Sequence, residues 1–315
     1  MAGQLGVRGE IRKVSYTMNE YTKEQLVNFK PKHDSFVGID SDGCVFPTME
    51  IKQKQCFHSE IIKCWKLEKI ERYVRECAEF ANLYSKWRGV NRFPALLMTF
   101  DLLRDRPEAG PDGLITPELT ALRKFVNSGI PLSNATLRAE VEKTGDPELS
   151  HVLEWSNAVN ANVAKTVTKL PPFKWVAESL AKIARHSDMI VVSQTPEEAL
   201  VREWQESGMD QYIGFIAGQE MGTKAEHIAM ATEDRYLPQR ILMIGDAPGD
   251  LKAARANSAF FYPINPGREE ESWRVFHTEA YDRFLNGTYG GEYEQGLVEV
   301  FDRLLPSTPP WKMNK

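Results

Sequence analysis

The chain has 315 residues, of which 42% are hydrophobic, and a formal net charge of −5 at pH 7. This length suits one large domain or two of ordinary size. This negative net charge does not favour the binding of nucleic acid, so we expect no nucleic-acid partner. The first residues form no apolar leader, and no later run is long enough to cross a bilayer. We therefore expect a cytoplasmic protein without a membrane partner.

Residues 1–33 are predicted to form an N-terminal arm, because their polar and apolar residues show only weak periodicity. The apolar run from Phe36 to Ile39 then predicts a buried strand. Asp40 and Asp42 follow this strand, and Gly43 allows a tight turn there. Two neighbouring carboxylates repel each other unless a cation or a shared proton joins them. The stretch alone indicates either a metal-assisted catalytic pair or an ordinary Asp-Gly turn.

Residues 51–169 are predicted to form a helical block. Apolar residues recur at helical spacing from Ile61 to Tyr84, and Ser59 is a candidate cap for that helix. A second helix is predicted to open at Thr116, and two more span residues 134–143 and 147–167. The four cysteines, which are Cys44, Cys56, Cys64 and Cys77, show no zinc-site spacing, so we expect reduced thiols.

The helical block contains one compact cationic cluster, formed by Lys86, Arg88, Asn91 and Arg92. Basic side chains in such a cluster can bind an anionic substrate. They are also common on solvated loops, and the sequence leaves both interpretations open.

Beyond the boundary at residues 170–172, strands alternate with helices, which is the pattern of a parallel sheet. Capping-box signatures at Thr195 and Thr223 predict the starts of two of the helices. The predicted fold class is α/β, with a Rossmann-like parallel sheet, helices on both faces and an inserted all-helical domain. We expect four segments: an arm at 1–33, a discontinuous α/β core at 34–50 and 170–266, the helical block at 51–169, and a helical extension at 267–315.

Polar residues that can take part in phosphate chemistry follow the predicted strands. Besides the first aspartates, Ser193 follows one strand, and Asp246 and Asp250 follow another, while Lys224 begins a helix. In a parallel sheet all of them would meet at one edge. Carboxylates that hold magnesium, together with a hydroxyl and an ammonium group, are what phosphoryl transfer requires.

This ordered set of four motifs resembles the haloacid dehalogenase superfamily, with a helical cap of the C1 type between the first and second motifs. The resemblance implies that Asp40 is a nucleophile that forms an aspartyl phosphate. It implies that Asp42 donates and accepts the proton. Ser193 would hold a phosphoryl oxygen, and Lys224 would orient Asp40. Cys44 departs from the family pattern, which usually has threonine at this position.

The resemblance also implies a magnesium ion, held by Asp40, the backbone carbonyl of Asp42, Asp246 and Asp250. The expected function is hydrolysis of a small phosphorylated metabolite, with a sugar phosphate as one candidate. A carboxylate at position 42 favours phosphate-ester chemistry over dehalogenation. The residues expected to contact the substrate are Gly43, Gln194, Arg88, Asn91 and Arg92.

Three alternatives share some of these residues. A phosphomutase would use the same active site and isomerise the ester without releasing phosphate. A non-catalytic phospho-ligand-binding protein would bind phosphate and magnesium without turnover. A response-regulator receiver combines similar groups, but the position of Lys224 ahead of the last acidic pair disfavours it. The sequence predicts neither the substrate nor the oligomeric state.

Overall fold

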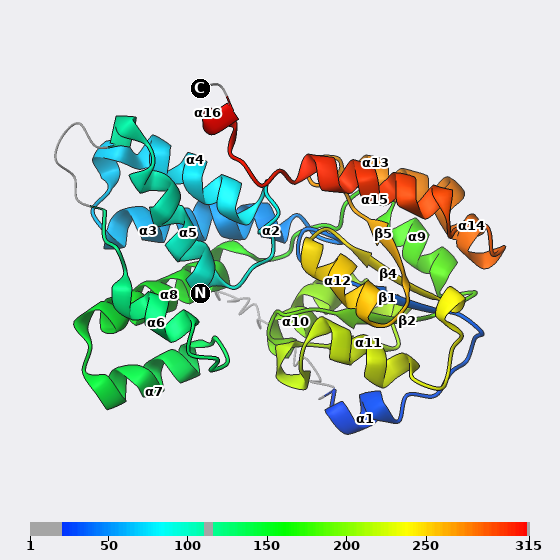
Figure 1. The fold of residues 1–315 in the computed structure, drawn as a ribbon. Helices are drawn as coiled ribbons and strands as arrows, with labels where there is room; N and C mark the ends of the chain where they lie inside the picture. Colours follow the sequence, from blue (N-terminus) through cyan, green and yellow to red (C-terminus); the bar gives the residue numbers. More distant parts are fainter. Residues whose placement is uncertain (1–20, 110–115, 314–315) are drawn as a thin grey trace, which may run out of the picture.

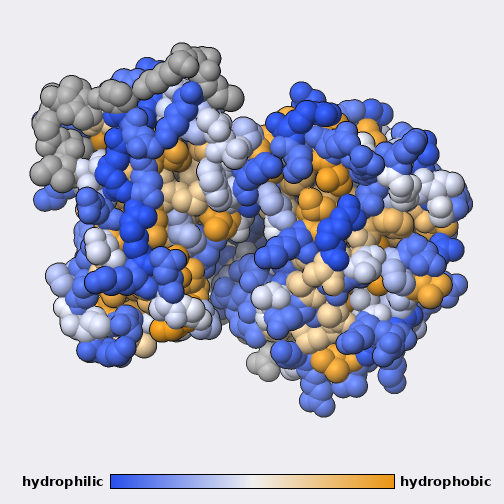
Figure 2. All heavy atoms as spheres, viewed as in Figure 1, coloured by the Kyte–Doolittle hydropathy of each residue, from blue (hydrophilic) through white to orange (hydrophobic). Residues whose placement is uncertain are grey.

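The computed structural model describes residues 21–109 and 116–313, which form two lobes (Figure 1). One lobe is built around a sheet, and the other is entirely helical. In the space-filling view the two lobes meet along a furrow, and hydrophilic side chains cover much of both (Figure 2). Among the described residues, no helix combines the length and the apolar character that a bilayer span requires.

Five parallel strands form the sheet, in the order β3-β2-β1-β4-β5. Their bounds are β1 (Phe36–Ile39), β2 (Asp188–Val192), β3 (Phe215–Ala217), β4 (Ile241–Gly245) and β5 (Phe260–Pro263). All four residues of β1 are buried, as expected for a strand that is covered on both faces. Because β1 lies between β2 and β4, the residues that follow these three strands are neighbours in space.

Helices cover both faces of the sheet (Figure 1). Side chains such as Val37 and Ile39 pack on one face against α9 (Val176–Ile183), α10 (Glu197–Ser207), α13 (Glu269–Val275), η7 (Phe276–Ala280) and α14 (Tyr281–Leu285). The other face packs against α1 (Lys23–Val27), α11 (Lys224–Thr232), α12 (Pro248–Ala256) and α15 (Glu292–Leu304). Short turns of 3₁₀ helix complete this lobe: η4 (Asp210–Tyr212), η5 (Gln219–Met221) and η6 (Pro238–Arg240). The predicted fold class is confirmed.

The helical lobe follows β1 in the chain and has a hydrophobic core of its own, with Trp155, Phe100 and Val152 fully buried. Its first helix is continuous, but it widens to a π-helix in the middle: α2 (Thr48–Ile51), η1 (Lys52–Phe57) and α3 (His58–Cys64). The remaining elements are η2 (Glu68–Ile70), α4 (Glu71–Asn82), α5 (Arg92–Arg104), η3 (Pro107–Ala109), α6 (Thr120–Val126), α7 (Asn134–Thr144) and α8 (Pro147–Thr166).

The C-terminal segment crosses from the sheet lobe to the helical lobe and ends in α16 (Pro310–Met313) (Figure 1). The Pro306 carbonyl accepts from the Lys86 amide at 3.3 Å. The Trp311 ring lies 4.5 Å from the guanidinium carbon of Arg106 and contacts the edge of Phe80. This segment therefore fastens the two lobes together.

Two predicted helix starts in the helical lobe are wrong. Ser59 lies inside a helix that already begins at Thr48, so it caps nothing. The helix predicted to open at Thr116 begins at Thr120, because Leu119 adopts a left-handed conformation with φ of 52°. The starts of α7, α8 and α11 agree with the prediction. All four cysteines are free thiols, as expected.

Candidate active site

The predicted site residues follow three neighbouring strands at one edge of the sheet. Asp40 follows β1, Ser193 follows β2 and Asp246 follows β4. The Asp40 amide still donates to the Ile244 carbonyl at 3.0 Å, so this carboxylate is fixed in register with β4. The sheet therefore brings residues from distant parts of the sequence to one place, at the edge where open α/β sheets bind ligands.

Lys224 joins two of the carboxylates. It is the first residue of α11, where Thr223 and Glu226 form the predicted capping box. Its Nζ lies 3.0 Å from Asp40 Oδ1 and 2.5 Å from Asp250 Oδ1. Burial raises the pKa of Asp40 well above its usual range, although Lys224 opposes this shift. Burial would lower the pKa of Lys224, but the two carboxylates outweigh it and raise that pKa, so the lysine stays charged.

Asp250 is oriented by backbone amides. Its Oδ2 accepts from the amides of Asp246 at 3.1 Å and Ala247 at 3.0 Å, just before α12. The carboxylate packs so closely on the end of β4 that a Cβ at Gly245 would overlap it. Glycine at this position therefore allows Asp250 to reach Lys224.

Asp246 is paired with an arginine from the helical lobe. Its Oδ2 accepts from Arg88 Nε at 2.8 Å and from Nη2 at 2.5 Å. The other terminal nitrogen of Arg88 donates to the Leu83 carbonyl at 2.9 Å. Gly43 has φ of +79° and lies so close that a Cβ there would be 2.5 Å from Asp246 Oδ2 and 2.7 Å from Arg88 Nη2. Arg88 is buried, so the solvated-loop interpretation does not hold for this residue.

Three of these carboxylates fit a hard divalent cation. Asp40, Asp246 and Asp250 are buried, and each offers an oxygen within 4.8 Å of the other two. Within the part of the chain that the structure describes, the buried Oδ1 of Asp246 has no hydrogen-bond partner. A buried carboxylate oxygen is unfavourable without a donor or a cation. Clustered carboxylate oxygens are the ligands that magnesium and calcium prefer.

Asp42 has a separate set of partners. Its two oxygens lie 2.6 and 2.8 Å from Lys52 Nζ, and Thr195 Oγ1 donates to it at 2.7 Å. The Thr48 hydroxyl donates to it as well. Burial opposes ionisation, but Lys52 and the hydroxyls outweigh it and lower the pKa of Asp42. Asp42 is therefore ready to accept a proton rather than to donate one in this arrangement.

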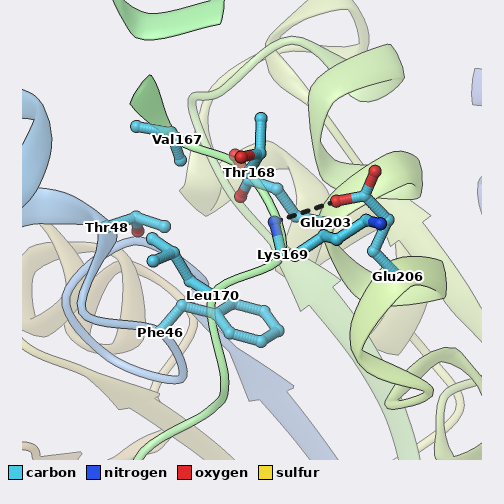
Figure 3. Close-up of a pocket in the computed structure, with 8 residues that line it drawn as sticks. All are labelled: Phe46, Thr48, Val167, Thr168, Lys169, Leu170, Glu203 and Glu206. Carbon is cyan, nitrogen blue, oxygen red and sulfur yellow. Dashed lines mark hydrogen bonds between the residues drawn. The ribbon is translucent and has the colours of Figure 1, made fainter. Parts of the chain in front are cut away.

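Glu203 of α10 lies beside this pair, and its Oε1 is 3.6 Å from Lys52 Nζ. Burial, followed by the negative charge of Asp42, raises the pKa of Glu203 to about 7. Glu203 lines a small pocket where the chain leaves the sheet lobe for the helical lobe and returns (Figure 3). The other lining residues are Phe46, Thr48, Val167, Thr168, Lys169, Leu170 and Glu206.

Two buried indoles fix the loop after β1. Trp204 Nε1 donates to Ser41 Oγ at 3.0 Å. Trp273 Nε1 donates to the Cys44 carbonyl at 2.8 Å. Burial raises the pKa of Cys44 well above its usual range, so the thiol stays protonated and packs in the core. Because Trp273 belongs to α13, a helix that follows the last strand in the chain helps to hold the loop that carries Asp40 and Asp42.

Ser193 and Gln194 lie at the end of β2 as predicted, but Thr195 does not cap α10. Ser193 Oγ is buried and accepts from the Thr195 amide at 3.2 Å. Gln194 Nε2 donates to the Gly222 carbonyl at 2.9 Å. The predicted capping box at Thr195 is wrong, because α10 begins at Glu197 and the Thr195 hydroxyl turns to Asp42.

Asn91 and Arg92 have partners inside the helical lobe. Asn91 Oδ1 accepts from the Phe93 amide and caps α5. Arg92 Nη1 donates to Ser156 Oγ at 2.9 Å and to Asn160 Oδ1 at 2.7 Å. Their contact with a substrate stays a prediction, whereas Arg88 lies directly at the carboxylates.

Sequence reasoning missed Lys52, Thr48, Thr195 and Glu203. Lys52 stands in the polar run of residues 52–55, where its charge resembles that of any exposed helical lysine. Thr195 follows Ser193 directly, but its capping-box spacing pointed to a different role. The local sequence around Thr48 and Glu203 carries no signal of this kind.

No family model and no curated protein matches the chain. Among solved structures, a beta-phosphoglucomutase from Clostridium difficile is 14% identical, with a TM-score of 0.46 over 81% of this chain and 97% of that chain. A haloacid dehalogenase-superfamily hydrolase of subfamily IA from Geobacter sulfurreducens is 14% identical, with a TM-score of 0.39 over 74% and 90%. A haloacid dehalogenase-like hydrolase from Streptococcus pneumoniae is also 14% identical, with a TM-score of 0.40 over 78% and 91%. The structural neighbours of this chain thus include hydrolases of the haloacid dehalogenase superfamily, while its chemistry is inferred from the side chains described above.

Proposed function

We propose that this protein is a magnesium-dependent phosphatase of the haloacid dehalogenase superfamily, which hydrolyses a small phosphorylated metabolite. The observation that carries the proposal is the buried bridge of Lys224 between Asp40 and Asp250, beside Asp246. It combines a carboxylate nucleophile, a fixed ammonium group and oxygen ligands for a cation. These are the groups that phosphoryl transfer requires.

In the proposed reaction Asp40 attacks phosphorus through Oδ2, because Lys224 holds Oδ1. The bond from phosphorus to the ester oxygen breaks, and Asp42 gives its proton to that leaving oxygen. A water molecule then attacks the aspartyl phosphate, Asp42 takes the proton back, and inorganic phosphate leaves. Lys52 favours the ionised form of Asp42. The first step therefore requires the substrate's phosphoryl charge, or a shift of Lys52, to raise the pKa of Asp42.

Magnesium, when bound, would offset the charge on the phosphoryl oxygens. Asp40, Asp246 and Asp250 would hold it, together with the backbone carbonyl of Asp42. Ser193 and Lys224 would contact the phosphoryl group, and Gly43 and Gln194 would contact the substrate beside it.

The test is phosphate release from a panel of phosphorylated metabolites with magnesium, using Asp40→Asn as the blank. Asp302, which is exposed on α15, provides the matched control as Asp302→Asn. We expect activity in the wild type and in this control, and none in Asp40→Asn or after chelation. Activity that survives either treatment would refute the proposal. Isomerised ester without released phosphate would identify a phosphomutase instead.

A further inference from the structure

The ion pair between Arg88 and Asp246 joins the helical lobe to the carboxylates of the site. Arg88 lies in the turn between α4 and α5, and the side chains of both partners are at most 1% exposed. The same turn packs on the loop after β4, since a Cβ at Gly89 would lie 3.0 Å from the Cβ of Ala247. A side chain from the helical lobe thus contacts one of the three carboxylates that could hold a cation.

This contact gives Asp246 a permanent positive neighbour. A guanidinium does not lose its proton in proteins, and both contacts from Arg88 fall on Oδ2. The other oxygen, Oδ1, is buried without a partner among the described residues. A divalent cation at Oδ1 would share the Asp246 carboxylate with the guanidinium. Positive charges that share one carboxylate repel each other strongly in a buried site.

The charges of the site point the same way. The site contains three carboxylates and two basic side chains, which are Asp40, Asp246, Asp250, Lys224 and Arg88. If all three carboxylates are ionised, the net charge of the site is −1. A divalent cation would turn this excess into a positive one, whereas without Arg88 it would balance the site. Arg88 therefore already supplies part of the charge that a cation would provide.

We propose that Arg88 competes with the divalent cation for Asp246, so that cation binding weakens the attachment of the helical lobe at residues 83–91. The inference rests on the proposed function, because it takes Asp246 as a cation ligand. Coupling between two binding events is reciprocal. If the docked turn weakens cation binding, then the cation must loosen the turn by the same factor.

The first test measures the affinity for Mn²⁺, which reports binding by its paramagnetic signal without any substrate. We expect Arg88→Gln to bind Mn²⁺ at least about tenfold more tightly than the wild type, because the repulsion is removed. Arg88→Lys keeps the charge and should change the affinity less. Arg138→Gln is the matched control, since it removes the same charge from an exposed position on α7 of the helical lobe. Asp246→Asn should weaken binding.

Unchanged, weaker or absent Mn²⁺ binding by folded Arg88→Gln would overturn the competition, because Arg88 would then support the site or be irrelevant to it. Circular dichroism and thermal unfolding establish that each variant is folded. Phosphate release plays no part in this measurement. An inactive protein that binds Mn²⁺ in the expected order would refute the proposed function and leave the competition standing.

The second test needs no substitution. Hydrogen exchange of the wild type reports on the turn through its bonded amides, including Arg88 to the Ser85 carbonyl at 3.0 Å and Val90 to the Trp87 carbonyl at 2.9 Å. We expect Mg²⁺ to accelerate exchange at residues 85–90, and to have no such effect in Asp246→Asn. Unchanged or slower exchange at these amides in the wild type would contradict the proposal.

Discussion

The candidate active site has two halves, which differ in the lobe that supplies the positively charged side chain. In the core half, Asp40 and Asp250 share Lys224, and all three residues belong to the sheet lobe. In the lobe-facing half, Asp42 is paired with Lys52, and Asp246 is paired with Arg88. Both of these basic side chains belong to the helical lobe. The core half is complete without the helical lobe. The lobe-facing half depends on how that lobe is docked.

Asp40 and Asp42 also differ in the direction in which their pKa values are shifted. Burial raises the pKa of Asp40, which has one ammonium partner to share with Asp250. Asp42 is only two residues away, yet its lysine and two hydroxyls lower its pKa despite burial. The difference follows from the number of donors, because donors to the ionised form stabilise it. Two aspartates in one loop thus differ in how readily they ionise, because their partners differ.

The largest expected effect is on the rate of hydrolysis, and it assigns Asp40 and Asp42 to different steps of the reaction. Asp42→Asn should slow hydrolysis of an alkyl phosphate by about 10²–10⁴-fold, because a general acid and base is lost. An activated aryl phosphate needs no proton on its leaving group, so this variant should still form the phosphoenzyme and release one aryl alcohol per site in a burst. Asp40→Asn should show no burst. Rapid-mixing absorbance and intact mass measure both, and equal behaviour of the two variants would contradict the division of roles.

The next effect concerns stability in the core half. Lys224→Met leaves Asp40 and Asp250 buried without their cation, which should lower the free energy of unfolding by roughly 3–5 kcal/mol at pH 7. The loss should shrink as the pH falls through the raised pKa of Asp40, because a protonated Asp40 no longer needs a positive partner. Denaturant titration measures it, with Lys252→Met as the control because Lys252 is exposed on α12. A loss similar to that of the control would mean that water already screens the pair.

A smaller effect concerns pH in the lobe-facing half. The pKa of Glu203 rises from 4.5 to about 7 on folding, so the folded protein binds this proton more tightly than the unfolded chain. Stability from this group is present below pH 4.5 and is lost as the pH rises through 7. Glu203→Gln should therefore gain on the order of 1–3 kcal/mol relative to the wild type between pH 5 and 8.

Unfolding titrations across that pH range provide the measurement. Glu198→Gln is the matched control, because Glu198 is exposed on the same helix. Parallel pH profiles for the wild type and Glu203→Gln would show that Glu203 does not titrate in this window.

The smallest effect concerns the attachment of the helical lobe. Trp311→Ala removes a half-buried ring from Phe80 and Arg106, and we expect a loss of about 1–2 kcal/mol in unfolding free energy. Hydrogen exchange should rise in α4, while the core half around Lys224 keeps its protection. Lys312→Ala removes only an exposed ion pair with Asp105 and should cost less than about 1 kcal/mol. Equal protection of α4 with and without the ring would show that the segment does not fasten the lobes.

The sequence by itself determined the core half. Short apolar runs predict buried strands, and the polar residue after each run must lie at the strand end. The capping box at Thr223 places Lys224 in the first turn of its helix, and the structure contains that box. These are local signals, each contained within a few residues. The parallel order of strands then brings Asp40 and Asp250 together.

Only the tertiary structure decided the partners of Asp42 and Asp246. Arg88 and Asp246 are 158 residues apart in the chain, and Thr195 and Asp42 are 153 apart. No periodicity or capping rule connects such pairs. The contact between Arg88 and Asp246 depends on how one lobe packs against the other, and the contact between Thr195 and Asp42 depends on the pairing of β1 with β2. With a different packing, the Thr195 hydroxyl could cap a helix and the Arg88 guanidinium could face water. The local sequence therefore does not predict which carboxylate each of them contacts.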